Sequence, residues 1–385
     1  MASTGTLRGG ALIRKQPSYY TAEQACQYLE RVGYVEAAYT AQDITEGRFP
    51  ADLENMAVLV RRHLLSFCNE STPMHYSAEH YLDVSPEATF KRLVVDRLGG
   101  TYCYGHHYLI LGVFRALGYR AYSGIARMNH GFFGNGPPAY AAYGHMMLFV
   151  QLGEGYGTDP AHTWVVDVAP GPPAPMLPMP LSADPQNIVR GASPGEVNRL
   201  TRGFSPQSSL VLPDAPGSPY SPNQAARVVD EHALWQVEYC GGAGSPTPEF
   251  KPVYQFMEQE FSLLDYAVQH YTKMYKPFED IFWDDIVCAR YVLADEHEEG
   301  AERRKITERT LAKLGLFRGV VKKRIGFREL ERVVLKSESE RVVALKKYFD
   351  VNIEEKDIVH IEGRASSLAS LAKKTALSAG LETAF

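Results

Sequence analysis

One cysteine of the 385-residue chain stands at a position that suits covalent chemistry. Cys103 follows the flexible segment Gly99-Gly100-Thr101 and opens an apolar run that predicts a helix, with Thr101 as a candidate N-cap. A thiol in the first turn of a helix lies at the positive end of the helix dipole, near unpaired backbone N–H groups. Both features favour the thiolate, and the same N–H groups could hold an oxyanion. The alternative is a buried cysteine on a core-facing helix.

A thiolate nucleophile works with a histidine base and with a group that orients that histidine. His106 and His107 follow Cys103 by one helical turn and could reach it along the helix surface. The sequence gives neither of them an evident orienting partner, so a histidine from another segment is the better candidate.

His145 is favoured as the base because of its place in a predicted hairpin. It begins a strand-like run, and Asp167 lies near the end of the next such run, with the turn-rich segment Gly153–Gly157 between them. If the two runs pair in a hairpin centred on Tyr156, His145 and Asp167 face each other with Cβ atoms about 4.5–5.5 Å apart. A register that differs by one residue would place them on opposite faces.

Asp167 lies between two valines, which predicts a carboxylate in an apolar setting. A buried charge of this kind needs a partner. The partner is either His145, which the carboxylate would then orient, or backbone amides in a purely structural arrangement.

The composition is that of a globular protein, with 45% hydrophobic, 22% charged and 11% aromatic residues. It excludes a disordered chain, a coiled coil and a collagen-like fibre. The net charge of −5 provides no positive field for nucleic acid or anionic lipid. No apolar stretch reaches the ~20 residues of a membrane-spanning helix, and the polar start Met1–Gly10 is unlike a secretory signal.

The five cysteines are odd in number and scattered, which argues against a secreted disulfide framework and favours a reducing compartment. The sequence has no CxxC pair and no Cys/His cluster with zinc spacing, so no metal site is expected. Four cysteines are expected to be small buried hydrophobes: Cys26, Cys68, Cys240 and Cys288.

Helices are predicted for the first third of the chain. They begin at the capping-box segment Thr21–Gln24, after Pro50, and at Cys103, and the third ends at Gly118. After about Ala121, short apolar runs bounded by glycine and proline predict strands.

Proline, glycine and serine then dominate two long stretches, Ala169–Pro180 and Ser205–Pro222, which predicts surface loops. A helical pattern returns at Val253–Tyr275. The remaining chain alternates strand-like runs with a helix that the capping box Ser337–Glu340 opens. The length predicts two or three domains, at about 100–200 residues each.

Three segments, taken in chain order, resemble the arylamine N-acetyltransferases. They are Gly99-Gly-Thr-Tyr-Cys103 at the start of a helix, Gly144-His145-Met-Met-Leu-Phe-Val on a strand, and Val165-Val-Asp167-Val. Further agreement lies in Tyr28–Tyr34, His63-Leu-Leu, Leu117–Arg120, Ala126-Arg127 and Tyr348–Ile353. The resemblance spans most of the chain, from about Tyr19 to Ile353.

The resemblance implies an α+β fold with a cysteine-protease-like catalytic core. A helical domain over residues 1–121 would carry the nucleophile, and a β-barrel domain over residues 122–249 would carry the histidine and the aspartate. An interdomain helix and an α/β lid would follow over residues 250–385. Cys103 is carried over as the nucleophile, His145 as the base and Asp167 as the orienting carboxylate.

The reaction implied by the resemblance moves an acetyl or malonyl group from acetyl-CoA or another acyl-CoA to an aromatic amine or hydrazine. It passes through an acyl-cysteine and follows ping-pong kinetics. The family also implies a cytoplasmic enzyme of xenobiotic metabolism that holds no permanently bound cofactor. Cations on the lid are candidates for the CoA phosphates: Arg303, Arg304, Lys305, Lys322, Lys323 and Arg324.

The sequence departs from the family pattern near the nucleophile. Gly99 stands where the family has an arginine, and Cys68 stands where it has the glutamate that pairs with that arginine. Because the arginine and the glutamate are both absent, neither is left as an unpaired buried charge. The Gly-Phe-Gly that usually follows the aspartate reads Ala169-Pro170-Gly171, and Gly131–Gly144 has the character of an insertion. These features are more similar to fungal members, some of which prefer malonyl-CoA.

Two readings from other classes stay open. A hydrolase or a transglutaminase-like enzyme uses the same Cys-His-Asp constellation. An inactive homologue would bind an acyl-CoA without turning it over.

Overall fold

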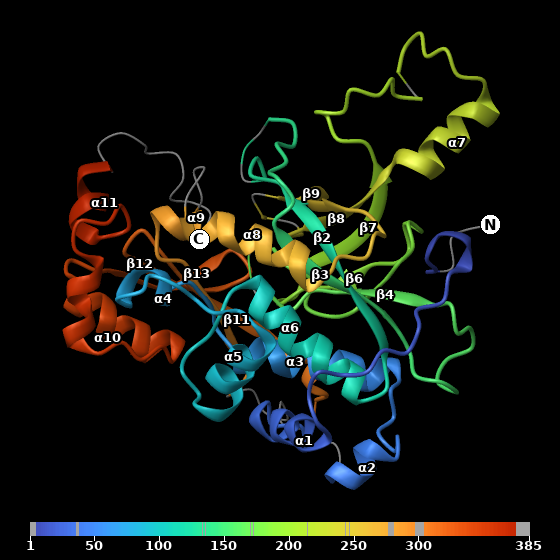
Figure 1. Cartoon of the computed structure of the whole chain (residues 1–385). Coiled ribbons are helices and arrows are strands. Elements are labelled where there is room, and N and C mark those ends of the chain that lie inside the picture. The colour runs from blue at the N-terminus through green and yellow to red at the C-terminus, as the bar shows by residue number, and fades with distance from the viewer. Residues whose placement is uncertain are drawn as a thin grey trace.

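Two antiparallel sheets and the helices around them form the protein, seen here in a computed structural model (Figure 1). The structure describes residues 5–374 apart from 36–37, 133, 135, 170, 172, 214, 243, 246, 276–280 and 297–303. Arg303, one of the candidate CoA-binding cations, lies outside the described residues.

The helices of the N-terminal third begin where the sequence predicts. Helix α1 spans Ala22–Arg31, and Thr21 and Gln24 form the predicted capping box. Asp52 caps α3 (Leu53–Ser66), and α6 spans Cys103–Ala116. The other helices of this part are short: α2 (Ala41–Thr45), α4 (Pro73–Tyr76), α5 (Pro86–Phe90) and a π-helical turn at Lys91–Val95.

The larger sheet has eight strands in the order β5-β4-β3-β2-β9-β8-β7-β6 and curves into a nearly closed barrel. Its strands are β2 (Arg120–Met128), β3 (His145–Gln151), β4 (Thr163–Val166), β5 (Met179–Pro180), β6 (Val189–Arg190), β7 (Val197–Gly203), β8 (Leu234–Cys240) and β9 (Lys251–Phe256). The two strand-like runs that carry His145 and Asp167 are therefore neighbours, as predicted.

The prediction of a helix over Val253–Tyr275 is wrong in its first part. Residues 253–256 belong to β9, which pairs with β2 on one side and β8 on the other, and helix α8 spans Leu263–Tyr275. A short apolar run does not distinguish a buried helix from a buried strand by its periodicity. Residues 253–256 form a strand because they pair with β2 and β8. These partners are distant in the sequence, so the local sequence does not indicate them.

The smaller sheet has five strands in the order β1-β10-β11-β12-β13. Four come from the C-terminal part: β10 (Cys288–Leu293), β11 (Leu311–Phe317), β12 (Val320–Ile325) and β13 (Arg328–Val334). The fifth, β1 (Asn69–Glu70), comes from the N-terminal third and pairs with β10. The smaller sheet is thereby joined to the segment that follows α3.

Three helices precede or follow the strands of the smaller sheet in the chain. Ser337 accepts a hydrogen bond from the Glu340 N–H and caps α10 (Glu338–Phe349), where the sequence predicts a helix start. Two short helices, α9 (Ile281–Asp284) and α11 (Leu368–Lys374), lie on either side of this part in the chain.

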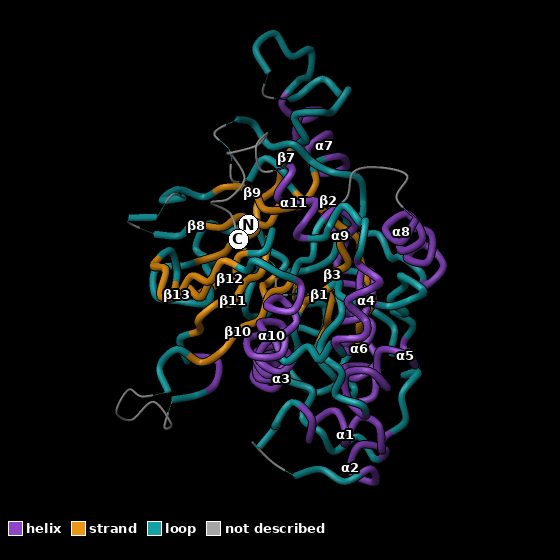
Figure 2. Tube along the Cα trace, turned by 90° about the vertical axis from the view of Figure 1, so that its left-hand side faces the viewer, coloured by secondary structure: helices purple, strands orange, loops and turns teal. Residues whose placement is uncertain are grey.

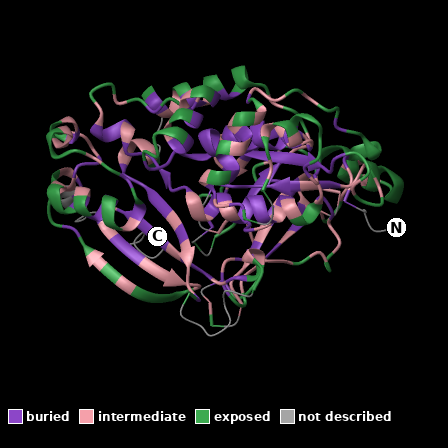
Figure 3. Ribbon diagram, turned by 90° about the horizontal axis from the view of Figure 1, so that it is seen from below, coloured by how far each residue is buried: buried purple, intermediate pink, exposed green. Residues whose placement is uncertain are grey.

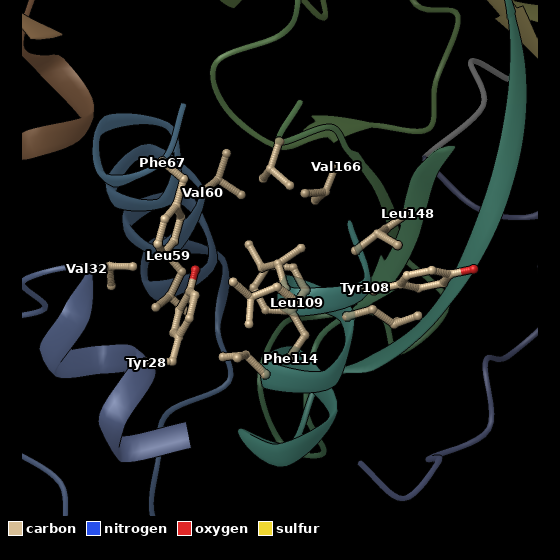
Figure 4. Close-up of a cluster of buried hydrophobic side chains, with 14 of the residues drawn as sticks. Tyr28, Val32, Leu59, Val60, Phe67, Tyr108, Leu109, Phe114, Leu148 and Val166 are labelled. Atoms are coloured by element: carbon tan, nitrogen blue, oxygen red, sulfur yellow. The ribbon is translucent and has the colours of Figure 1, made fainter. Parts of the chain in front are cut away.

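The main hydrophobic core lies where α1, α3 and α6 meet β3 and β4 (Figure 4). Tyr28 from α1, Leu59 from α3 and Leu109 from α6 are almost completely buried there, with Leu148 and Val166 from the strands. This core fixes α6 against the hairpin, and therefore fixes the element that carries Cys103 against the elements that carry His145 and Asp167.

Helix α7 (Pro222–His232), which the sequence did not predict, projects from the barrel with the loop before it (Figures 1 and 2). It has no buried residue. Burial is concentrated in the middle of the molecule (Figure 3). Among the described helices, none is both long and apolar enough to cross a membrane.

The three predicted domain ranges remain predictions. Within them, β9 lies in the barrel sheet although the boundary at residue 250 assigns it to the C-terminal part.

Candidate active site

Cys103 is the first residue of α6 and is almost completely buried. Among the described residues, no side chain caps this helix, and the N-cap position belongs to Tyr102, not to the predicted Thr101. The Thr101 hydroxyl has no hydrogen-bond partner among the described residues, whereas its backbone N–H and carbonyl both have one. The first N–H groups of a helix are orphan donors, so the end of α6 that carries the thiol presents a partial positive charge.

His145 opens β3 beside the cysteine. The Sγ atom of Cys103 lies 3.9 Å from the carbonyl oxygen of Gly144, the residue before the histidine. The Nε2 atom of His145 lies 2.8 Å from Oδ2 of Asp167. Since Nε2 is taken by the aspartate, Nδ1 is the ring nitrogen that remains for the thiol.

The hairpin register differs from the prediction by two residues. Leu148 pairs with Val166 and Gln151 with Thr163, so His145 and Asp167 are diagonal neighbours and do not stand directly opposite. A shift of two residues preserves the face of each side chain, because strand side chains alternate with a period of two. The predicted contact therefore forms despite the wrong centre of the hairpin.

Asp167 is buried and uses both of the partners proposed from the sequence. Its Oδ2 accepts from His145, and its Oδ1 accepts from the backbone N–H of Ala169 at 3.0 Å. Burial alone would raise the pKa of Asp167, but the charge of His145 and the contacts with His107 and His145 together outweigh burial and lower that pKa below its ordinary range. The carboxylate is therefore ionised.

The environment of His145 favours its charged form. Burial alone would lower the pKa of His145, but the charge of Asp167 and hydrogen bonds with Asp167 and Cys103 outweigh burial and raise the pKa to about 10. An imidazolium at neutral pH stabilises an adjacent thiolate. The three side chains form a Cys-His-Asp arrangement in which the imidazolium lies between the thiol and the carboxylate.

Comparisons with known proteins identify the family of the chain. A family model described as N-acetyltransferase matches residues 52–358. The chain belongs to the arylamine N-acetyltransferase family.

Two fungal proteins named N-malonyltransferase FDB2 are similar in sequence. The one from Gibberella moniliformis is 25% identical over 312 residues, which cover 78% of this chain and 79% of that protein. The one from Fusarium pseudograminearum is 25% identical over 315 residues, with the same coverage.

Solved structures share the fold. The arylamine N-acetyltransferase from Mycobacterium abscessus aligns with a TM-score of 0.62 at 18% identity, over 93% of this chain and 99% of that one. The Mycobacterium marinum arylamine N-acetyltransferase in complex with CoA aligns with a TM-score of 0.58 at 20% identity, over 90% and 98%. Family membership makes the protein an acyl-CoA-dependent N-acyltransferase and favours this class over a hydrolase or an inactive binding homologue.

The protein has a buried ion pair near Cys103, although the family positions for it hold Gly99 and Cys68. Glu70, fully buried, accepts a hydrogen bond from Arg92 at 2.8 Å. The two side chains also bind Gly100: Arg92 Nε donates to its carbonyl at 2.8 Å, and its N–H donates to Glu70 at 3.4 Å. The sequence did not reveal this pair, because its residues lie outside the family motif.

Backbone contacts complete the support of the nucleophile segment. The Thr101 N–H donates to the Cys68 carbonyl at 3.2 Å, and the Glu70 N–H donates to the Thr101 carbonyl at 2.9 Å. A Cβ atom on Gly100 would lie 1.7 Å from the Cys68 carbonyl oxygen, so this close approach requires glycine.

Two further residues lie close to Asp167, and the sequence does not predict this for either of them. Tyr254 on β9 lies next to Asp167; burial first, and then the charge of Asp167, raise its pKa above the ordinary value. His107 lies 3.3 Å from Asp167, through Nε2 and Oδ1. The sequence treated it as a local neighbour of Cys103 because no pattern shows that α6 packs on the loop after β4.

Most of the described candidate cations for CoA already have partners. Arg304 lies 3.4 Å from Asp295, Lys305 lies 2.6 Å from Glu54, and Arg324 lies 3.4 Å from Glu329. Lys322 is largely buried. These residues do not form an unpaired basic patch. Among the described residues, no group of three or more His, Cys, Asp or Glu side chains is placed to hold a metal ion.

Proposed function

We propose that Cys103 is the nucleophile, that His145 is the proton carrier and that Asp167 orients and stabilises the histidine. The single observation that carries this proposal is the 2.8 Å bond between His145 Nε2 and Asp167 Oδ2, beside a thiol at the start of a helix. It leaves His145 Nδ1 facing the thiol and keeps the imidazolium charged.

In the first half-reaction, the Cys103 thiolate attacks the thioester carbonyl of the acyl-CoA. The S–C bond to the enzyme forms and the C–S bond to CoA breaks. His145 gives its proton to the departing CoA thiolate, so the products are CoA-SH, acyl-Cys103 and a neutral imidazole. The N–H groups at the start of α6 stabilise the oxyanion that develops on the carbonyl.

In the second half-reaction, a neutral amine attacks acyl-Cys103. Its nitrogen forms the amide bond, His145 accepts the proton, and the Cys103 thiolate leaves. The imidazolium–thiolate pair is thereby restored. An aromatic amine suits this step, since a weakly basic amine is neutral at pH 7 and needs no prior deprotonation.

The acceptor in this proposal is an aromatic amine or hydrazine. Three tyrosine rings gather on the side of α6 next to the nucleophile: Tyr266 lies 5.4 Å from Tyr104 and 5.9 Å from Tyr108, between ring centroids. Burial first, and then the charge of Cys103, raise the pKa of Tyr108. These rings are almost completely buried, so the proposal of an aromatic acceptor rests on family membership.

The acyl donor in this proposal is acetyl-CoA or malonyl-CoA, used as a co-substrate and not held permanently. Family membership supports the acetyl group, and the printed name of the fungal relatives supports the malonyl group. We also propose a cytoplasmic location and a role in the metabolism of foreign amines. All five cysteines lie in the described part and are free, which fits a reducing compartment.

The test is mass spectrometry of the intact protein after mixing with each acyl-CoA and no amine. Wild type should gain one acetyl or malonyl group on Cys103 within a single turnover, and Cys103→Ala should gain none. Adding an arylamine should discharge the group as an amide. Discharge to water at the same rate would identify a hydrolase, and binding of CoA without any acyl mass would identify an inactive homologue.

A further inference from the structure

His107 joins the two halves of the candidate site. It lies on α6 one turn after Cys103, is completely buried, and is remote in sequence from the loop after β4. Its Nδ1 lies 2.7 Å from the Cys103 carbonyl oxygen, and its Nε2 lies 3.1 Å from the backbone nitrogen of Val168. One side chain therefore contacts the backbone of the nucleophile and the backbone next to the triad carboxylate.

The partners fix the protonation state of the His107 ring. A carbonyl oxygen accepts only, so Nδ1 carries the proton. A backbone N–H donates only, so Nε2 carries a lone pair toward Val168. Both bonds form together only in the neutral tautomer with the proton on Nδ1. A protonated ring would leave the buried Val168 N–H without its acceptor, which costs free energy.

The neutral ring leaves the charge of Asp167 to His145. Nε2 of His107 lies 3.3 Å from Asp167 Oδ1, which also accepts from the Ala169 N–H, but in this tautomer Nε2 has no proton to donate to the carboxylate. The His107 ring stands edge-on to the His145 ring, with centroids 6.0 Å apart and planes at 86°. Both histidines lie within reach of the carboxylate, but with a neutral His107 ring it is His145 that forms the ion pair.

The loop that carries Asp167 needs such an anchor. Strand β4 ends at Val166, so residues 167–169 lie beyond the last pairing with β3. His107 attaches this stretch to α6 at a point one turn from the nucleophile. Small displacements of catalytic groups cost about 100-fold in rate when they approach 1 Å.

We propose that His107 is a positioning residue of the acyl transfer, whose neutral imidazole sets the separation between the Cys103 backbone and the loop that holds Asp167. This inference rests on the proposed roles of Cys103, His145 and Asp167. His107 itself touches neither the acyl group nor the amine in this scheme.

Three substitutions separate the two bonds. His107→Phe keeps the ring and removes both. His107→Gln reaches as far as Nε2 and keeps an acceptor for Val168, whereas His107→Asn is shorter and keeps a donor for the Cys103 carbonyl. The expected order of acylation rate constants is wild type, then Gln, then Asn and Phe. The loss in His107→Phe should be on the order of 10–100-fold, up to the cost of a misplacement of about 1 Å.

The decisive readouts are single-turnover acylation by acetyl-CoA and malonyl-CoA and the pH titration of the Cys103 thiolate at 240 nm. In His107→Phe the KM for the acyl-CoA should stay within about twofold while the thiolate forms at higher pH, because Asp167 no longer holds His145 as firmly. The matched control is His106→Phe. His106 is equally buried one residue away, but its ring binds His63 at 3.0 Å.

His106→Phe should lose thermal stability and still acylate with the wild-type rate and thiolate titration. The inference is overturned if His107→Phe matches His106→Phe in both readouts. If His107→Phe does not fold, equal rates in the Gln and Asn variants overturn it. A wild type that never gains an acyl group on Cys103 refutes the proposed function instead, so the two failures are distinguishable.

Discussion

His145 and Asp167 are two residues away from direct register at the ends of neighbouring strands, yet Nε2 of the histidine lies 2.8 Å from Oδ2 of the aspartate. The carboxylate therefore reaches the ring along a diagonal. This hydrogen bond and the negative charge of Asp167 determine whether His145 is an imidazolium when the acyl-CoA binds.

Asp167→Asn tests that charge with little change in shape. The amide cannot raise the pKa of His145 as the carboxylate does, so the imidazolium–thiolate pair should be lost near neutral pH. We expect acylation to slow by on the order of 10³–10⁴-fold, the scale known for this change in a serine triad. The measurement is single-turnover acylation followed by mass spectrometry, together with the thiolate absorbance at 240 nm.

The control for this change is Asp159→Asn. Asp159 lies 3.8 Å from His162 and both are partly exposed, so it is a His–Asp pair outside the site. This variant should acylate as fast as wild type. A fast Asp167→Asn enzyme with a normal thiolate titration would remove Asp167 from the triad.

Arg92→Met tests the ion pair that supports Gly100. It leaves Glu70 buried with its strongest partner gone, and the expected loss is about 3–5 kcal/mol in the free energy of unfolding. The double variant Glu70→Gln/Arg92→Met should recover part of this loss, because no unpaired charge remains. Urea unfolding of wild type, Arg92→Met, Glu70→Gln and the double variant measures the coupling free energy between the two side chains.

The control pair is exposed on α7. Arg227 lies 2.7 Å from Glu231, and Arg227→Met should leave the stability unchanged within error. Equal stabilities of Arg92→Met and Arg227→Met would mean that the buried pair contributes nothing.

Gly100→Ala tests the close approach behind the nucleophile. The new Cβ atom would lie 1.7 Å from the backbone carbonyl of Cys68, so the segment before Cys103 must move. We expect a loss of about 1–3 kcal/mol or more in the free energy of unfolding, and slower acylation even at temperatures where the variant is folded. Gly136→Ala is the control, because its Cβ atom would meet no atom within 4 Å. Wild-type acylation by folded Gly100→Ala would show that the segment tolerates displacement.

The sequence predicts that the three proposed triad residues lie close together, because they lie on elements with strong local signals. Cys103 starts a helix, and His145 and Asp167 lie on two runs that pair as a hairpin. The error of two residues in the register does no harm, since it preserves the face of each side chain. An error of one residue would have separated the histidine from its carboxylate.

Contacts between distant segments are what the sequence does not predict. Glu70 and Arg92 lie on different elements and bond directly at 2.8 Å beside Gly100, and His107 reaches Val168 because α6 packs on the barrel. For the same reason the sequence predicts a helix at Val253–Phe256, where the structure has a strand. The partners of that strand, β2 and β8, lie elsewhere in the chain. Local propensity is overruled wherever a tertiary edge is available.

Buried histidines outside the triad predict how stability depends on acid. Burial first, and then neighbouring positive charges, lower the pKa of His75 to about 3, and burial lowers the pKa of His106 to about 3. In the unfolded chain a histidine has a pKa of about 6.5. Below that pH the unfolded state binds more protons than the folded state, so the stability falls as the pH drops from about 6.5 toward 3.

His75→Gln isolates one of these groups. Gln can still bond the Phe282 carbonyl and the Ser366 hydroxyl, which His75 contacts at 2.9 and 2.8 Å, but it does not titrate. The variant should be less stable than wild type at pH 8, and the gap should narrow by up to about 1.4 kcal/mol for each pH unit below 6.5. Urea unfolding between pH 5 and 8 measures the gap. Met74→Ala, a buried change one residue away that removes no titrating group, should keep a constant gap; a constant gap for His75→Gln as well would mean that His75 has an ordinary pKa in the folded protein.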